Sequence, residues 1–319
     1  MRGVIVGAWI FGGLAALVLA AAAVGLRPDI PRSQVLQART MPDSRFLTLK
    51  DGSIAHVRIS GEGPPLVLLH GFSSSAWAWD GWTRELSGSY RLIRIDAPGH
   101  GLTLMARDAD LSPEGATRFV AEILDQLGVA RAAFAGNSMG GAQAWRFAAR
   151  HPERVSALIL IDSAGPQSRR VEGDISRVRR AASNPALRFV LLNGGGQIVM
   201  GQALKSGVFE SARITPEIVR RTDDLYRAEG NRATLLRILE ARGAGDDVRV
   251  EDVRAPTLIM QGEEDGLVPP EVAHALAAAI RGSRLVVYPR LGHTPHEEDP
   301  VRTAADAAAF LKETQAAAP

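Results

Sequence analysis

Short, continuous apolar runs recur along the chain, and they restrict its fold more than any other feature. They lack the regular polar alternation of a strand with one face in water, so each is typical of a strand buried on both faces of a parallel sheet. The six runs are Leu66–Leu69, Tyr90–Ile95, Ala132–Ala135, Ala157–Ile161, Thr257–Met260 and Leu285–Tyr288.

Stretches with helical character separate these runs. They are Pro113–Leu127, Gly140–Arg150, Pro270–Ile280 and Val301–Lys312. Strand and helix therefore alternate, which predicts an open, doubly wound α/β sheet. Ahead of them, Phe46–Lys50 and Ile54–Ile59 flank the turn Asp51-Gly52-Ser53. We expect a β-hairpin there, which adds an antiparallel edge to the sheet.

The domain organisation follows from the point in the chain where strands and helices cease to alternate. A chain of 319 residues can bury one large core with a modest insertion. Residues 163–253 are rich in arginine and in helix formers and hold no convincing strand. We expect them to form a helical cap over a core made of residues 44–162 and 254–315. Residues 28–43, with prolines and few apolar residues in series, are predicted to be a linker.

The first residues form a segment of another kind. Gly3–Leu26 is 24 residues long without a charge, and a helix of that length, at about 1.5 Å per residue, spans a bilayer. We therefore expect residues 1–27 to be a transmembrane anchor, with the folded domain on the extracytoplasmic (periplasmic) side. A signal peptide cleaved near Ala20–Ala23 is the alternative and would give a secreted protein. Arginines flank both ends of the run, so the distribution of positive charge indicates only weakly how the segment is oriented in the membrane.

Composition excludes several functions. Lys and Arg total 37 against 35 for Asp and Glu, so no strong positive field favours nucleic acid, and none is expected as a partner. The chain has no cysteine, which excludes disulfides, thiolate metal sites and cysteine nucleophiles.

A serine between glycines stands at the junction of one strand and one helix. The pentapeptide Gly-Asn-Ser-Met-Gly, residues 136–140, follows the run Ala132–Ala135 and opens the helical stretch that ends at Arg150. This strand, sharp turn and helix is the context of a nucleophile elbow, with Ser138 as the nucleophile. The flanking glycines and Gly141 would let helix and strands approach a strained turn. A glycine-rich helix start with a capping serine is the alternative.

A serine hydroxyl attacks only when a base takes its proton. His293 follows the last predicted strand, so its loop can reach back over Ser138 from the carboxyl edge of the sheet. The rivals are His100 and His296. His100 also ends a strand, but it precedes Ser138 and so breaks the chain order Ser, acid, His.

The base in turn needs a carboxylate that fixes its tautomer. Asp265 follows the strand Thr257–Met260 and is the expected acid. Asp162, which follows the preceding strand, is the alternative, and Glu264 is a further one.

The tetrahedral intermediate of acyl transfer needs N–H donors for its oxyanion. We expect the backbone N–H groups of Met139 and Phe72 to supply them, with Gly71 giving the chain the freedom to turn. Trp77 and Trp79 follow closely in the sequence. With Gly71 they are the candidates for an apolar substrate pocket. Alternatively the two tryptophans pack the loop, and the sequence favours neither alternative.

Taken in order, these motifs closely resemble the α/β-hydrolase superfamily, from about Ser44 to the last helix. The motifs are His70-Gly71-Phe72, Asp-Ala-Pro-Gly-His-Gly at 96–101, the serine pentapeptide, Gly-Glu-Glu-Asp at 262–265 with Val268-Pro269, and Gly292-His293 followed by Glu298-Asp299-Pro300. The resemblance implies an eight-stranded, mostly parallel sheet with a helical cap. It also implies a triad of Ser138, Asp265 and His293 that uses neither a metal nor an organic cofactor.

The resemblance also narrows the reaction. Haloalkane dehalogenases and epoxide hydrolases carry Asp at the elbow, where this chain has Ser138. The stretch Gly-Asn-Ser-Met-Gly-Gly is similar to that of the meta-cleavage C–C bond hydrolases. Those usually have a Gly-Pro-Gly oxyanion loop and an aromatic after the catalytic His, whereas Ser73-Ser74-Ser75 and Thr294 stand here.

The predicted activity is hydrolysis of a small-molecule carboxylic ester, with an apolar acyl group, through an acyl-enzyme. C–C bond hydrolysis is one alternative. A membrane-tethered binding protein with slow turnover is the alternative from another functional class.

Overall fold

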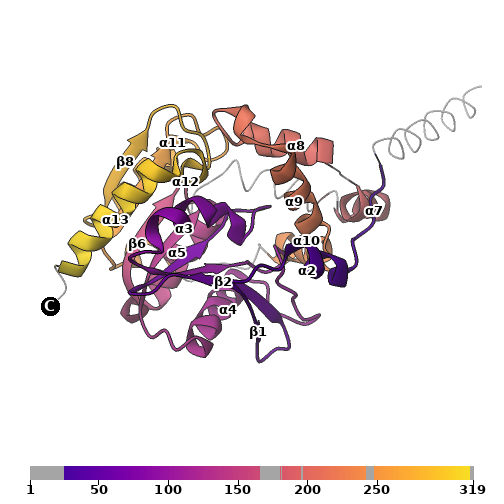
Figure 1. The fold of residues 1–319 in the computed structure, drawn as a ribbon, viewed down its shortest axis with the longest axis horizontal. Coiled ribbons are helices and arrows are strands. Elements are labelled where there is room, and N and C mark those ends of the chain that lie inside the picture. Colours follow the sequence, from indigo (N-terminus) through magenta and orange to yellow (C-terminus); the bar gives the residue numbers. More distant parts are fainter. Residues whose placement is uncertain (1–24, 166–179, 181, 195–196, 242–247, 317–319) are drawn as a thin grey trace, which may run out of the picture.

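The computed structural model of the protein describes residues 25–165, 180, 182–194, 197–241 and 248–316 (Figure 1). One eight-stranded sheet runs through its core in the order β1-β2-β4-β3-β5-β6-β7-β8. The strands are β1 Ser44–Thr48, β2 Ile54–Ser60, β3 Pro65–Leu69, β4 Arg91–Ile95, β5 Ala132–Asn137, β6 Val155–Ile161, β7 Thr257–Gly262 and β8 Arg284–Tyr288.

The sheet is mostly parallel. Strand β2 pairs antiparallel with β1 and with β4, and all other neighbours pair in parallel. The edge hairpin turns tightly, because Gly52 adopts a φ of +84° and the Ser53 N–H donates to Asp51 Oδ1 at 2.8 Å. This confirms both the parallel sheet that the apolar runs predicted and the antiparallel hairpin at its edge.

Helices cover both faces of the sheet. They are α3 Asp80–Leu86, α4 Pro113–Gln126, α5 Met139–Arg150, α11 Pro270–Ala279, α12 Pro295–Glu298 and α13 Pro300–Ala316, with 3₁₀ turns η1 Ala76–Trp79 and η2 Pro152–Arg154. Helices α4, α5 and α11 bury one apolar cluster against the sheet, and α3 and α13 bury a second on the opposite face. The central strands therefore lie between two apolar layers, which is why their sequences need no polar face.

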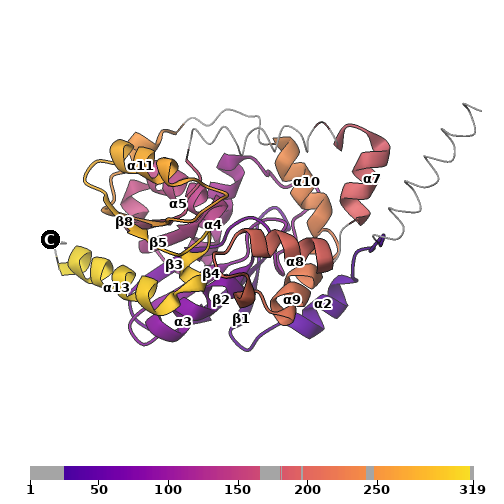
Figure 2. The same ribbon diagram turned by 90° about the horizontal axis from the view of Figure 1, so that it is seen from above.

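The segment between β6 and β7 supplies the cap. It contains α7 Pro185–Asn193, α8 Gln197–Ser206, α9 Pro216–Tyr226 and α10 Asn231–Ala241, with 3₁₀ turns η3 Ser211–Arg213 and η4 Val250–Asp252. Among its described residues there is no strand, as the sequence led us to expect. Figure 2 shows these four helices gathered with α2 to one side of the sheet.

The predicted linker, residues 28–43, contains a helix that the sequence did not predict. Helix α2, Arg32–Arg39, packs Val35 into an apolar cluster with Leu225 of the cap. The Arg32 guanidinium donates to Leu102 O at 3.0 Å and to Asn231 Oδ1 at 2.8 Å. Tertiary contacts rather than a strong helical pattern stabilise this short helix, so the pattern alone did not reveal it.

The predicted membrane segment, Gly3–Leu26, lies outside the described residues except for its last two. Within the part of the chain that the structure describes, none of the helices combines the length and apolarity needed to cross a bilayer.

Helix α5 lies very close to the sheet. A Cβ atom added to Gly140 would lie 2.1 Å from the carbonyl oxygen of Leu69, and one added to Gly136 would lie 2.3 Å from that of Gly140. A Cβ on Gly141 would lie 2.5 Å from Ser163 Oγ. All three contacts are too short for a real Cβ, which confirms that this junction requires glycine.

Replacing Gly140 with Ala should therefore destabilise the fold. We expect the free energy of unfolding to fall by about 1–3 kcal/mol, because the backbone of β3 must move to admit the methyl group. The control is Gly88→Ala, where a Cβ meets nothing within 4 Å; it should change stability by no more than about 0.5 kcal/mol. Urea denaturation measures both, and equal stabilities would contradict this account of the packing.

Candidate active site

Ser138 occupies a strained turn between β5 and α5. Its backbone angles are φ +53° and ψ −114°, which non-glycine residues rarely adopt. Three backbone hydrogen bonds hold it there: its N–H donates to Ile161 O at 3.0 Å, and its carbonyl accepts from Ala142 at 3.0 Å and Ala164 at 3.1 Å. Strand β6 and helix α5 thus hold the turn in place. Ser138 directly follows β5 and therefore lies at the carboxyl end of that strand.

Asp265 and His293 come together at the same edge. His293 Nδ1 lies 2.7 Å from Asp265 Oδ2, and the other carboxylate oxygen, Oδ1, accepts from the N–H groups of Leu267 at 2.7 Å and Val268 at 3.0 Å. Burial alone would raise the pKa of Asp265, but the hydrogen bond and charge of His293 and these N–H donors hold it below its usual value.

The loop that carries His293 is fixed against the serine turn. Asn137, the residue before Ser138, donates its side-chain N–H to His293 O at 2.9 Å. From the cap, Gly207 accepts the His293 N–H at 2.7 Å. The structure therefore places the Asp265–His293 pair beside the elbow, and the role of Ser138 as its third member stays a prediction.

The comparisons with known proteins agree with this geometry. Residues 64–300 match the family model described as the alpha/beta hydrolase fold. The chain belongs to the α/β-hydrolase fold family. It is similar to an uncharacterized protein of Mycobacterium tuberculosis, with 30% identity over 77% of this chain and 74% of that protein. It is also similar to the pimeloyl-[acyl-carrier protein] methyl ester esterase of Nitrosomonas europaea, with 30% identity over 75% of this chain and 92% of the esterase.

The comparison with solved structures agrees with this family assignment. The meta-cleavage product hydrolase of Pseudomonas fluorescens IP01 superposes with a TM-score of 0.71 and 26% identity, over 84% of this chain and 97% of the hydrolase. The chain is thus an α/β-hydrolase whose relatives include both an esterase and a meta-cleavage product hydrolase.

The loop that is predicted to hold the oxyanion runs along the serine turn. A Cβ on Gly71 would lie 2.7 Å from Asn137 Oδ1 and 3.4 Å from Ser138 Cβ, so this loop approaches the serine turn closely. Met139 begins helix α5, whose N-terminal N–H groups point toward the turn. Phe72 and Met139 therefore lie on the two segments that meet at Ser138, and their N–H groups stay the predicted oxyanion donors.

The two rival histidines have other surroundings. His100 Nδ1 lies 2.9 Å from Pro98 O, and His100 Nε2 accepts from the Ser73 N–H at 3.1 Å. His296 is buried against the ring of Trp79, and neither ring nitrogen has a hydrogen-bond partner among the described residues. Burial lowers the pKa of His296 to about 3, so this ring stays neutral near pH 7.

The tryptophans pack the loop. Trp79 is fully buried in the apolar cluster under α3 and α13, and Trp77 is buried between Leu102 and Leu225, beneath the guanidinium of Arg58. The structure thus favours the second alternative that the sequence left open, and neither ring lines the cavity described next.

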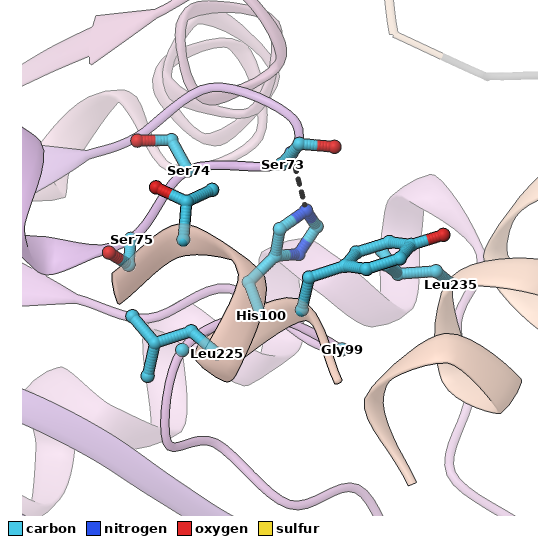
Figure 3. A pocket seen from close by; sticks show the side chains of 10 residues that line it. Ser73, Ser74, Ser75, Gly99, His100, Leu225 and Leu235 are labelled. Atoms are coloured by element: carbon cyan, nitrogen blue, oxygen red, sulfur yellow. Dashed lines mark hydrogen bonds between the residues drawn. The ribbon is translucent and has the colours of Figure 1, made fainter. Parts of the chain in front are cut away.

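A small cavity lies between the core loops and the cap (Figure 3). It is lined by Ser73, Ser74, Ser75, Gly99, His100, Gly101, Thr222, Leu225, Tyr226 and Leu235. Its volume is about 10 Å³, room for about one water molecule. Ser138, Asp265 and His293 are not among the residues that line this cavity.

Two buried carboxylates, Asp96 and Glu298, hold the loops around the site in place. Both lie in the sequence motifs, but the sequence did not predict a role for either. Asp96 accepts from Ala76 at 2.7 Å and Leu102 at 2.8 Å. Glu298 accepts from the N–H groups of Gly292 at 3.0 Å and Phe209 at 2.7 Å, and so joins the His293 loop to the cap. Asp96 and Glu298 both stand in the motifs that carry the family resemblance, and only this position in the sequence could have indicated their roles.

No cluster of three or more metal-binding side chains occurs within the described ranges.

Asp162, the alternative acid, lies next to Asp265 rather than on His293. It is fully buried at the end of β6, with φ +42°, and its Oδ1 accepts from the Gly262 N–H at 2.9 Å. Burial, and then the charge of Asp265, raise its pKa well above the usual range. Two adjacent carboxyls in a dry site do not both ionise, so Asp162 keeps its proton while Asp265 is charged. Glu264 is exposed.

This pair predicts a pH dependence of stability. Because the pKa of Asp162 is higher in the folded state than in the unfolded chain, the free energy of unfolding falls as pH rises between the two values. Asn is neutral and does not titrate. The stability of Asp162→Asn relative to wild type should therefore rise from about pH 4 to pH 7, by up to about 1.4 kcal/mol per pH unit. Urea denaturation over this range measures it, and a constant difference would contradict the assignment.

Proposed function

We propose that this α/β-hydrolase cleaves a carboxylic ester through an acyl-enzyme formed on Ser138. The 2.7 Å contact between Asp265 and His293, beside the strained turn of Ser138, carries this proposal. A carboxylate on Nδ1 fixes the tautomer in which Nε2 is free to accept a proton. That is the state of histidine that a serine nucleophile requires.

In the proposed reaction His293 accepts the hydroxyl proton as Ser138 Oγ bonds to the ester carbonyl carbon. The N–H groups of Phe72 and Met139 hold the oxyanion of the tetrahedral intermediate. The intermediate collapses as His293 returns the proton to the leaving alcohol. Water then adds to the acyl-enzyme by the same route, and the carboxylic acid and free Ser138 result.

One feature favours an ester over a C–C bond as the substrate. The predicted oxyanion loop carries Ser73-Ser74-Ser75, where C–C bond hydrolases usually have Gly-Pro-Gly. We propose an apolar acyl group because Leu225 and Leu235 of cap helices α9 and α10 lie beside this loop.

C–C bond hydrolysis is the second candidate. The similarity to the meta-cleavage product hydrolase favours it, and the same nucleophile, base and oxyanion donors would serve it. We also propose that residues 3–26 anchor the protein in a membrane, with the catalytic domain on the extracytoplasmic side. The charge-free length of that segment supports the anchor.

A substrate profile separates the two reactions. We expect turnover of p-nitrophenyl esters, with kcat/KM rising with acyl length over short chains, and no turnover of C–C diketones. Ser138→Ala should lose about 10⁴-fold or more of the esterase activity, because the nucleophile is gone. Faster cleavage of a diketone than of every ester would favour the C–C reaction. Activity near wild type in Ser138→Ala would contradict the proposed nucleophile.

The identity of the acid can be tested with two matched variants. Asp265→Asn should lower kcat by about 10³- to 10⁴-fold, because an amide at this place stabilises the wrong tautomer of His293. Asp162→Asn should keep kcat within about tenfold of wild type, since Asp162 is already neutral. Steady-state kinetics on one ester measures both, and the reverse ranking would make Asp162 the acid.

A further inference from the structure

Helix α7 of the cap consists mostly of large apolar residues, yet it has no buried residue. Its sequence is Pro-Ala-Leu-Arg-Phe-Val-Leu-Leu-Asn, and Leu187, Phe189 and Val190 are 49%, 54% and 44% exposed. Ile198, at the start of α8, is 80% exposed. We call these four residues the apolar cap face. Large apolar side chains gathered on one surface are normally covered, by protein or by lipid.

The end of the predicted anchor lies directly against this helix. The Arg27 N–H donates to Asn193 O, at the last residue of α7, at 2.8 Å. Leu26, which ends the charge-free run, is itself 47% exposed. A membrane segment that ends at Leu26 would therefore place α7 at the bilayer surface.

The connection between this point and the cap is fixed by ion pairs. Asp29 pairs with the buried Arg232 of α10 at 2.6 Å, and Arg39 of α2 pairs with Asp224 of α9 at 2.6 Å. Residues 27–39 are thus bound to the cap at both ends. The cap cannot move far from the membrane if Gly3–Leu26 is inserted in it.

Charge on the same surface suits a lipid headgroup. Arg188 lies in α7 among the apolar residues, and its side chain is 41% exposed, with Glu240 as its ion-pair partner at 2.5 Å. The side chain of Arg27 is 45% exposed and lies 3.6 Å from the buried carboxylate of Asp223. Interfacial helices combine large apolar side chains with arginines that reach the headgroups.

We propose that the apolar cap face inserts into the interfacial layer of a lipid bilayer, so that the cap rests on the membrane. The inference rests on the proposed anchor, residues 3–26, and goes beyond the proposed catalysis. It explains why α7 exposes large apolar side chains where the chain enters the domain. It also places the cap helices α9 and α10, which line the cavity, close to a source of acyl chains.

The absence of cysteine allows a direct test with the full chain. Single variants Phe189→Cys and Ile198→Cys, each labelled with the environment-sensitive fluorophore NBD, are reconstituted in phosphatidylcholine–phosphatidylglycerol vesicles. Val301→Cys is the control, because Val301 is 62% exposed at the start of α13, a helix that runs away from α7 toward the opposite side of the molecule in both views (Figures 1 and 2). Lipids with a spin label on the acyl chain quench only fluorophores that enter the bilayer.

We expect the labels at Phe189 and Ile198 to shift to shorter wavelength and to be quenched at least several-fold more than the label at Val301. Equal and weak quenching at all three positions would overturn the proposal, as would a chain that does not associate with the vesicles. A blue shift that grows with protein concentration and is insensitive to the lipid quencher would also overturn it, because a second copy would then cover the face. The same quenching pattern is expected in Ser138→Ala, so failure of the catalytic proposal leaves this result unaffected.

Discussion

The strained turn at Ser138 is the constraint on which the rest of the structure depends. A residue held at φ +53° and ψ −114° costs roughly 1–3 kcal/mol and persists only where its surroundings fix it. Here β6 and α5 supply the hydrogen bonds that fix it, and glycines at 136 and 140 let the backbones approach closely enough. The position of this half-buried serine is therefore a product of the packing of sheet and helix rather than of the pentapeptide alone.

Two neighbouring carboxyl groups at this edge of the sheet have different charge states. Asp265 has a histidine and two N–H donors around it, whereas Asp162 has one N–H donor and full burial. In a site with little water this difference decides which group carries the charge. The acid next to the histidine is thus kept ionised, and its neighbour neutral, by local hydrogen bonding.

Sequence predicted the sheet well, because strands buried on both faces leave continuous apolar runs, and it predicted the edge at which Ser138, Asp265 and His293 gather. It did not predict helix α2 or the cavity, since both depend on contacts between distant segments, such as Arg32 with Asn231. It also left Trp77 and Trp79 undecided, because a buried ring and a pocket-lining ring have the same sequence pattern. The role of Glu298 likewise emerges only when the His293 loop and the cap are seen together.

The central claim is that Ser138 is the nucleophile, and labelling with a fluorophosphonate followed by peptide mass spectrometry tests it most directly. The account predicts one phosphonate adduct, on the peptide that contains Ser138, formed much more slowly in His293→Ala because the base is missing. An adduct on another serine, such as Ser73, or no adduct in protein that hydrolyses esters, would contradict it.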